Sequence, residues 1–441
     1  MLINPARLFI SLSEKDLKMK TRPVYIAGGV RTPFVKSMTT YSKVSTQELM
    51  TVSLQQLIKK MHLEKRILGD VGLGAVMNSP FNWNLARECV LGSDLDPRTP
   101  GYTLQRACGT SLETTLQIAL KIANYQIDDG IAAGVDSNSD IPIMFSPSFA
   151  QKLLALNSAK DFSTKFKILA SFRFKDLKPQ FPAVVEPRTG LSMGQHTEKM
   201  VKEWDISRFE QDELAFKSHQ HGVKAYEEGF YDDLVFEFQG LTRDGILRKE
   251  TTMEKLARLK PVFDFSGAGT LTAGNSTPLT DGSSAVYLLC EDTAKKYEHP
   301  LLARFVDAQV AAVDYVHGEG LLMAPTVAVS ELLKRNKLTL QDFDFYEIHE
   351  AFEGQVLCTL KAWESEDYCK KVLHRDTALG AIDRGKMNIK GGSVALGHPF
   401  AATGTRIVAS LAKMLHQKGS GRGLISICTA GGMGVTAILE A

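Results

Sequence analysis

Short runs rich in β-branched residues or glycine alternate along this chain with segments of helical periodicity, and this alternation limits the possible folds. Residues 24–27 predict a strand, residues 45–61 a helix and residues 71–77 the next strand. The helix is marked by a capping box, Ser45-x-x-Glu48, and by apolar residues at helical spacing. Alternating elements of this kind are typical of α/β layers.

One arrangement occurs in both halves of the chain. Residues 108–125 predict a helix that leads through a turn to a strand at 131–135, and residues 398–417 and 424–428 repeat that order. Both helices are apolar nearly all round, as buried helices are. The pair suggests a duplicated fold whose two reactive loops meet centrally, although βαβ proteins repeat such units routinely.

The overall composition argues against several classes of function. The chain has 441 residues and a formal net charge of +2, which gives no global basis for binding nucleic acid or a membrane surface. No segment approaches the roughly 20 uninterrupted apolar residues of a membrane span. Residues 1–20 mix acidic and basic side chains, unlike a secretory signal or transit peptide. We expect a cytoplasmic protein with a short N-terminal extension.

The six cysteines are spread thinly, and none forms a Cys-x-x-Cys pair. A chain of this size does not need disulfides, and zinc sites usually have tightly spaced ligands. Cys358, Cys369 and His374 come closest to a metal-binding set, but their spacing is loose. We therefore predict no metal site.

Two candidate catalytic residues stand where helices are expected to begin. Cys108 lies between Ala107 and Gly109, at a helix N-terminus whose unpaired N–H groups would favour a thiolate. His398 precedes Pro399, which suits a first helical turn, and could act as the base for a nearby thiol. A buried core cysteine and a helix-capping histidine are the alternative interpretations.

Two further candidates end predicted strands. Cys428 is followed by a glycine-rich turn, residues 429–434, that could point backbone N–H groups at an oxyanion. His349 follows the predicted strand 343–348, at the carboxyl end where ligands bind in open α/β sheets. Taken singly, a core cysteine and a structural histidine remain alternatives.

Together these motifs resemble those of the thiolase family, from about residue 22 to the C-terminus. The motifs occur in thiolase order and spacing: Ala107-Cys108-Gly109, residues 269–275, His349-Glu350-Ala351-Phe352, Gly397-His398-Pro399 and residues 428–434. Most thiolases carry Asn in place of His349. With histidine at this position, the chain resembles one branch of the family. That branch contains the bacterial anaerobic 3-ketoacyl-CoA thiolases and the β-subunit of the trifunctional fatty-acid oxidation protein.

The resemblance implies a five-layer α-β-α-β-α fold built from two similar halves with an inserted loop domain. The expected parts are an extension at 1–20, an N-terminal half at 21–139 that resumes at 261–298, the insertion at 140–260 and a C-terminal half at 299–441. It also implies a homodimer or homotetramer.

The resemblance further implies CoA-dependent cleavage of 3-ketoacyl-CoA, as in fatty-acid β-oxidation. Cys108 would carry the acyl group after His398 takes its proton, and Cys428 would protonate the acetyl-CoA enolate. His398 and His349 would stabilise the enolate oxygen, and the backbone N–H groups of Cys108 and Ala430 the tetrahedral intermediate. Ala430 stands where glycine is common, so this second oxyanion hole depends on its backbone angles.

Other expectations concern ligands and alternative functions. Met193 and Phe352 are candidate substrate contacts, CoA and acyl-CoA are substrates, and no bound cofactor is implied. A biosynthetic acetyl-CoA C-acetyltransferase that makes acetoacetyl-CoA is one alternative. A non-catalytic lipid-carrier or scaffolding relative is another, although it would have lost the cysteines or His398. A ketoacyl-carrier-protein synthase would lack Cys428.

Residues 152–178 combine basic and apolar side chains in the expected insertion. One interpretation is a docking surface for a membrane or an acidic partner. The other is a helical hairpin whose aromatic residues cover the active-site mouth while its lysines face water. The resemblance adds that related β-subunits use this region to contact the membrane and a hydratase/dehydrogenase α-subunit.

Overall fold

The computed structural model describes residues 21–182 and 184–441, so the predicted extension at 1–20 lies outside the described residues. Its strands follow one hydrogen-bonded path, β4-β3-β5-β6-β1-β7-β10-β9-β8, and β2 pairs with β6. The strands are β1 Val24–Arg31, β2 Val35–Lys36, β3 Asp70–Leu73, β4 Gly101–Thr103, β5 Asp129–Asp136, β6 Thr280–Leu289, β7 Ala303–Ala312, β8 Phe345–Ile348, β9 Arg422–Thr429 and β10 Met433–Glu440.

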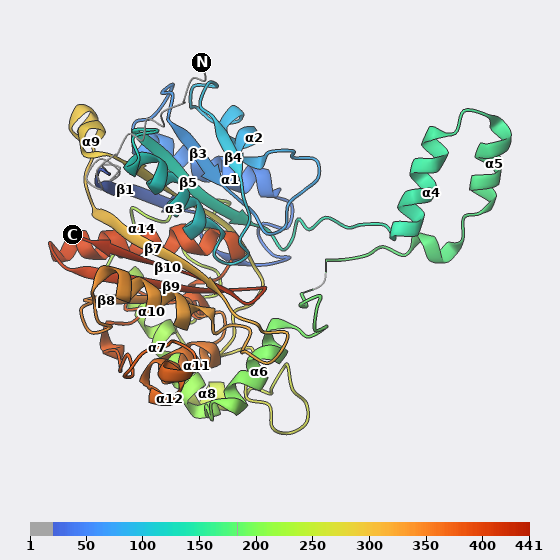
Figure 1. Cartoon of the computed structure of the whole chain (residues 1–441). Coiled ribbons are helices and arrows are strands. Elements are labelled where there is room, and N and C mark those ends of the chain that lie inside the picture. The colour runs from blue at the N-terminus through green and yellow to red at the C-terminus, as the bar shows by residue number, and fades with distance from the viewer. Residues whose placement is uncertain (1–20, 183) are drawn as a thin grey trace, which may run out of the picture.

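Helices lie between most of these strands in the chain (Figure 1). The α-helices are α1 Thr46–Lys60, α2 Leu85–Leu91, α3 Thr110–Ala123, α4 Pro147–Ser158, α5 Phe162–Ala170, α6 Met193–Glu203, α7 Arg208–Glu227, α8 Met253–Ala257, α9 Glu291–Tyr297, α10 Ala324–Asn336, α11 Glu353–Glu364, α12 Glu366–Lys371, α13 Ser393–Leu396 and α14 Thr403–Lys418. Three 3₁₀ turns are η1 Phe174–Leu177, η2 Arg384–Lys386 and η3 Phe400–Ala402.

The two halves of the sheet repeat one pattern. The order β3-β5-β6-β1 corresponds to β8-β9-β10-β7, and in each set the first pair is parallel and the other two are antiparallel. β1 and β7 pair over Val24–Ile26 and join the two halves. The duplication expected from the sequence is therefore present, and the two β layers are continuous through this pairing.

Three hydrophobic clusters separate the layers. α3 and α14 pack together in a central cluster, α1 and α2 cover the N-terminal half of the sheet, and α10 and α11 cover the C-terminal half. Side chains alternate between clusters along a strand: Val286 faces the central helices, whereas Tyr287 faces α1. This arrangement confirms the five-layer α-β-α-β-α fold.

The predicted helix at 45–61 forms as α1, with the Ser45–Glu48 capping box present. The predicted strand at 71–77 is wrong beyond Leu73, where β3 ends. The backbone N–H groups of Val76 and Met77 donate to the Asp136 carboxylate instead of a neighbouring strand. The Asp136 side chain, at the end of β5, thus takes the place of the strand-to-strand hydrogen bonds that the local sequence favours.

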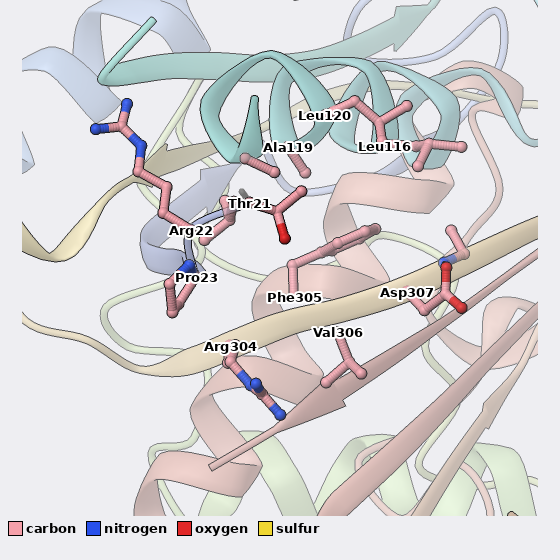
Figure 2. Close-up of a pocket in the computed structure, with 13 residues that line it drawn as sticks. Thr21, Arg22, Pro23, Leu116, Ala119, Leu120, Arg304, Phe305, Val306 and Asp307 are labelled. Atoms are coloured by element: carbon pink, nitrogen blue, oxygen red, sulfur yellow. The ribbon is translucent and has the colours of Figure 1, made fainter. Parts of the chain in front are cut away.

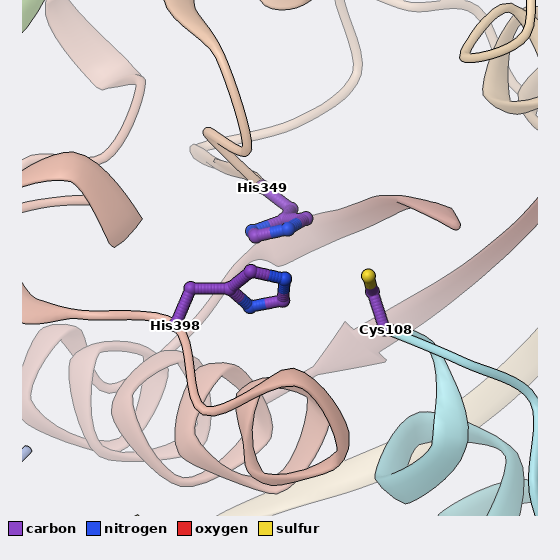
Figure 3. Close-up of side chains that lie close together, drawn as sticks. All are labelled: Cys108, His349 and His398. Carbon is purple, nitrogen blue, oxygen red and sulfur yellow. The ribbon is translucent and has the colours of Figure 1, made fainter. Parts of the chain in front are cut away.

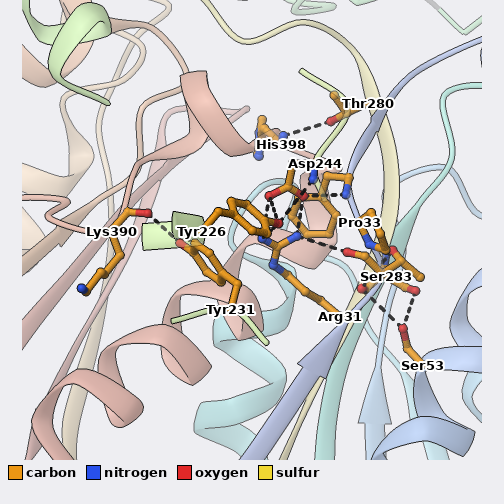
Figure 4. A network of polar contacts seen from close by, with 12 residues as sticks. Arg31, Pro33, Ser53, Tyr226, Tyr231, Asp244, Thr280, Ser283, Lys390 and His398 are labelled. Carbon is orange, nitrogen blue, oxygen red and sulfur yellow. Dashed lines mark hydrogen bonds and ion pairs between the residues drawn. The ribbon is translucent and has the colours of Figure 1, made fainter. Parts of the chain in front are cut away.

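A buried ion pair ties the segment after α7 to the N-terminal half (Figure 4). The Arg31 guanidinium contacts both Asp244 carboxylate oxygens at 2.5 and 2.7 Å, and Tyr226 donates to the same carboxylate at 2.8 Å. Asp244 also accepts the Phe34 N–H at 2.7 Å. Phe34 packs against Gly397, so this network supports the loop that carries His398.

Helices α4 and α5 form a hairpin that projects away from the layers at the end of two extended segments (Figure 1). Phe149 packs edge-on against Phe172, and Lys152 pairs with Asp176 at 2.7 Å, so the hairpin has contacts of its own. The interpretation of residues 152–178 as a cover over the active-site mouth is wrong for this structure. Among the described residues, no helix is both long and apolar enough to cross a membrane.

Candidate active site

Cys108 lies in a sharp turn between β4 and α3. Ala107 has a φ of +43°, a strained angle for a residue with a side chain, and α3 begins only at Thr110. Burial raises the pKa of the Cys108 thiol to about 12, although hydrogen bonds from the Ala430 and Cys108 backbones lower it. This shift favours a thiol in the resting site, and the stabilisation of a thiolate by the helix N-terminus stays a prediction.

His398 follows Gly397, whose φ is +112°. The predicted helix start at Pro399 is displaced, because η3 intervenes and α14 begins at Thr403. The His398 backbone N–H donates to Thr280 Oγ1 at 2.9 Å, and Nδ1 lies 2.6 Å from Thr403 Oγ1. Burial, with a smaller effect of the Arg406 charge, lowers the pKa of His398 to about 3. This shift favours the neutral imidazole, and in the tautomer whose Nδ1–H donates to Thr403 Oγ1 the Nε2 atom can accept a proton.

His349 follows β8 and is held by a relay of hydrogen bonds. Arg406 Nη2 donates to Ser393 Oγ at 2.7 Å, and Ser393 Oγ lies 2.8 Å from His349 Nδ1. Since the serine oxygen accepts from Arg406, its own hydrogen is free to point at Nδ1. In that arrangement the ring proton is on Nε2, which is buried and has no hydrogen-bond partner among the described residues. A buried donor without a partner is costly unless a ligand uses it.

The Cys108, His349 and His398 side chains lie close together (Figure 3). One sulfur or nitrogen atom from each lies within 4.8 Å of the others, and the two imidazole centroids are 4.1 Å apart. A thiolate and two imidazoles form a donor set that could hold zinc. Among the described residues, these three are close enough together to hold a metal ion, whereas Cys358, Cys369 and His374 do not form such a group.

Cys428 lies near the end of β9 and is fully buried. Its thiol donates to Gln355 Oε1 over 3.3 Å, and burial, with a smaller effect of Cys108, raises the pKa of Cys428 well above its ordinary value. Phe352 belongs to the same apolar cluster, and Met193 packs against it. Both candidate substrate contacts therefore lie in the apolar surroundings of Cys428.

The turn after Cys428 joins β9 to β10 through residues 430–432. Gly431 and Gly432 have φ angles of +76° and +71°, where a side chain would be strained. Ala430 does not have a positive φ, and its backbone is hydrogen-bonded to the Cys108 sulfur. Alanine at this position therefore does not strain the turn.

The sequence missed the residues that support these groups. Thr403, Ser393 and Gln355 orient the His398, His349 and Cys428 side chains, and Glu186 accepts the Gly431 N–H at 2.9 Å. Ser393 and Thr403 lie close to His398 in the chain, which is a weak local signal. Glu186 and Gln355 reach the site only through tertiary packing.

A separate surface pocket of about 420 Å³ lies between residues 21–24, α3 and β7 (Figure 2). Its walls include Leu116, Leu120 and Phe305. None of its lining residues belongs to the cysteine–histidine group, so this pocket is distinct from the candidate active site.

Comparisons with known proteins agree with the fold and the site. Residues 24–292 match the family described as "Thiolase, N-terminal domain", and residues 299–441 match "Thiolase, C-terminal domain". A 3-ketoacyl-CoA thiolase of Shewanella sp. (strain W3-18-1) is 38% identical over 427 residues, which cover 96% of this chain and 97% of the relative. One from Colwellia psychrerythraea is 38% identical over 423 residues, covering 95% and 97%.

Solved structures give the same result. Bacillus anthracis acetyl-CoA acetyltransferase has a TM-score of 0.79 and 30% identity, with 96% of this chain and 100% of that chain covered. Human mitochondrial 3-ketoacyl-CoA thiolase has a TM-score of 0.77 and 25% identity, with 95% and 99% covered. The chain is thus an acyltransferase with a duplicated α/β fold. It belongs to the thiolase family.

Proposed function

We propose that this protein cleaves 3-ketoacyl-CoA with CoA to give acetyl-CoA and an acyl-CoA shortened by two carbons. The observation that carries the proposal is the cluster of Cys108, His349 and His398 within 4.8 Å, on a thiolase fold. The names of the Shewanella and Colwellia relatives support the substrate class. CoA and acyl-CoA are substrates in this scheme, which needs no resident cofactor or metal.

In the first step His398 Nε2 takes the proton of Cys108, and the thiolate attacks the 3-keto carbon. The backbone N–H groups of Cys108 and Ala430, already directed at this sulfur, would stabilise the tetrahedral alkoxide. The lowered pKa of His398 favours a neutral imidazole, which has one ring nitrogen free to take the thiol proton.

Cleavage of the bond between the α and β carbons leaves acyl-Cys108 and the enolate of acetyl-CoA. His349 Nε2–H and the protonated His398 would stabilise the enolate oxygen. Each such donor is worth about 3–4 kcal/mol in a dry, preorganised site. The relay from Arg406 through Ser393 supports this role, since it directs the ring proton of His349 to Nε2.

Cys428 then donates its proton to the α carbon of the enolate, which forms acetyl-CoA. The CoA thiol restores the Cys428 proton as its sulfur attacks acyl-Cys108. Collapse of this second tetrahedral intermediate releases the shortened acyl-CoA, and Cys108 regains its proton from His398. A thiol whose pKa is raised by burial suits Cys428, because it is protonated before the enolate appears.

Intact-mass measurement after brief exposure to acetyl-CoA or acetoacetyl-CoA tests this proposal. We expect an acetyl adduct on the peptide that contains Cys108, and its absence in Cys108→Ala. An adduct that persists in Cys108→Ala would reject Cys108 as the nucleophile. A wild-type protein that takes no acetyl group would favour the non-catalytic lipid-carrier or scaffolding alternative.

The acetoacetyl-CoA-forming acetyltransferase is the second candidate, favoured by the likeness to the Bacillus anthracis enzyme. Thiolysis rates across 3-ketoacyl-CoA substrates of increasing chain length separate the two. A degradative enzyme should accept long chains, whereas a biosynthetic one should be restricted to acetoacetyl-CoA.

We further propose a cytoplasmic homodimer or homotetramer that has no nucleic-acid partner. A hydratase/dehydrogenase α-subunit is a proposed partner, since such a subunit would supply 3-ketoacyl-CoA. The hairpin of α4 and α5 is the proposed site of a weak membrane contact. Its support is the exposure of Phe162, Phe166 and Phe174, which are 84%, 63% and 94% exposed.

A further inference from the structure

Glu186 lies in the segment that returns from the α4–α5 hairpin to α6, yet its side chain is buried. The loop around it is closed by its own backbone: the Glu186 N–H donates to the Leu191 carbonyl, and the Gly190 N–H donates to the Glu186 carbonyl. A bridge between Val185 and Ser192 adjoins this turn. The backbone therefore fixes where the Glu186 carboxylate points.

The carboxylate connects two segments of the C-terminal half. Oε1 accepts the Gly431 N–H at 2.9 Å, and Oε2 accepts the Tyr315 hydroxyl at 3.1 Å. Tyr315 itself packs against Gly432, where a Cβ atom would come within 2.7 Å of its ring. The Val313 N–H donates to the Gly432 carbonyl at 2.8 Å. The turn at 430–432 is thus held from three directions.

This turn carries the N–H group that the proposed mechanism needs. Gly431 and Gly432 both have positive φ angles. Because glycine adopts positive and negative φ about equally readily, its own backbone preference does not hold the turn in this conformation. The Gly431 N–H and the Ala430 N–H belong to successive peptides joined at the Ala430 Cα, and a rotation about the Ala430 backbone bonds that changed the angle between these peptides would turn the Ala430 N–H away from the Cys108 sulfur. The Glu186 bond to Gly431 opposes that rotation, because breaking it would leave an oxygen of the buried Glu186 carboxylate without this donor.

We propose that Glu186 is a positioning residue for the second oxyanion hole, acting through Gly431 on the Ala430 N–H group. This inference rests on the proposed function, because it concerns the tetrahedral intermediates on Cys108. It predicts that steps which form these intermediates depend on Glu186, whether or not a carbon–carbon bond is broken. The carboxylate itself touches neither substrate nor reacting atoms.

Exchange of acetyl groups between acetyl-CoA and isotopically labelled CoA isolates these steps, since it needs no enolate. We expect Glu186→Ala to lower kcat for exchange and for thiolysis by the same factor, about 10–100-fold, with little change in KM. Complete loss of an oxyanion donor costs about 10²–10³-fold, and a misdirected donor should cost less. Glu186→Gln should stay within about threefold of wild type, because its amide can bond both Gly431 and Tyr315.

Two further variants give rates of exchange and thiolysis against which Glu186→Ala is compared. His349→Ala should lower thiolysis far more than exchange, because it removes the proposed donor to the enolate. Glu250→Ala removes an exposed carboxylate elsewhere in the inserted region and should leave both rates unchanged. Melting temperatures are measured for every variant.

A wild-type exchange rate in Glu186→Ala, or a loss confined to thiolysis, would overturn the role of Glu186. If Glu186→Ala does not fold, Glu186→Asp replaces it, since a shorter carboxylate cannot reach both partners. An unchanged exchange rate in folded Glu186→Asp would then overturn the proposal. Wild-type protein that accepts no acetyl group would instead refute the proposed function, so the two failures are distinguishable.

Discussion

Cys108, Cys428 and His398 are each almost wholly removed from solvent, and burial shifts the pKa of each toward its uncharged form. These shifts favour protonated thiols and a neutral imidazole over a thiolate–imidazolium ion pair in the resting site. Charge would then appear only as the reaction proceeds, beside the donors that stabilise it. Such a site favours a transition state over the resting state.

The pH dependence of alkylation at Cys108 should reflect this resting state. Because burial raises the pKa to about 12, the thiolate fraction is smaller than that of free cysteine at every pH below about 8.5. We expect the rate with iodoacetamide to rise about tenfold per pH unit from pH 7 to 10, without a plateau. Peptide mapping by mass follows Cys108. A plateau near pH 6 would instead reveal a thiolate–imidazolium pair.

Cys428→Ser tests the separation of the two cysteines. We expect thiolysis to fall by at least about 10²-fold, since serine is a much weaker acid for the enolate carbon. Acetyl transfer from acetyl-CoA to Cys108 should persist, because it involves no carbon acid. Steady-state kinetics and intact mass measure the two reactions. Full thiolysis by Cys428→Ser would reduce Cys428 to a packing role.

At the scale of elements, α3 and α14 bring the two reactive loops together. They cross closely at Gly404, where a Cβ atom would lie 2.2 Å from the Leu112 backbone nitrogen. The Thr405 N–H donates to Ser111 Oγ at 2.9 Å across the same contact. Because Cys108 precedes α3 and His398 precedes α14, this crossing sets the distance between the proposed nucleophile and the proposed base.

Gly404→Ala should therefore destabilise the fold and separate the two residues. Rigid backbone on the facing helix cannot move aside, so we expect a loss of about 2–3 kcal/mol in unfolding free energy. Gly222→Ala in α7 is the matched control, since its Cβ would meet the flexible ends of Leu247 and Leu396. There the gain in helix propensity should keep the loss below about 1 kcal/mol. Urea denaturation compares them, and equal losses would contradict the crossing argument.

At the scale of the whole molecule, the α4–α5 hairpin is the part that stands apart from the layers (Figure 1). Its exposed apolar side chains include Leu154, Phe162, Phe166 and Leu169. Lys160, Lys165, Lys167 and Arg173 are exposed on the same hairpin. Basic groups beside exposed aromatic rings are suited to an anionic membrane surface.

Co-sedimentation with vesicles that contain anionic lipid tests this contact. Wild type should bind at low salt and dissociate at high salt, because screening acts over about 8–10 Å near physiological ionic strength. Changing Lys160, Lys165, Lys167 and Arg173 to Glu should abolish sedimentation. The same charge change at four exposed lysines outside the hairpin should leave sedimentation unchanged. Suitable positions are Lys43, Lys59, Lys334 and Lys370. If the hairpin variant and wild type stay equally in the supernatant, the membrane contact is rejected.

Local sequence indicated many of the elements that form and the candidate catalytic residues, whose roles stay predictions. The capping box at Ser45, the two apolar helices and the motifs around Cys108, His349, His398 and Cys428 predicted the duplicated fold and its central site. Helical period, capping and glycine turns depend on residues close together in the chain, so a sequence displays them. The four-part division of domains, drawn from the resemblance, stays a prediction.

Only the tertiary structure decided how burial shifts the pKa values at the site. It also decided which distant residues bond to the reactive groups. Burial, which no motif reveals, raises the pKa of Cys108 and lowers the pKa of His398. Gln355 reaches Cys428 from 73 positions away in the chain, and Glu186 reaches Gly431 from 245 positions away. Contacts over such separations depend on how the layers pack, because packing sets both solvent exposure and which distant side chains meet.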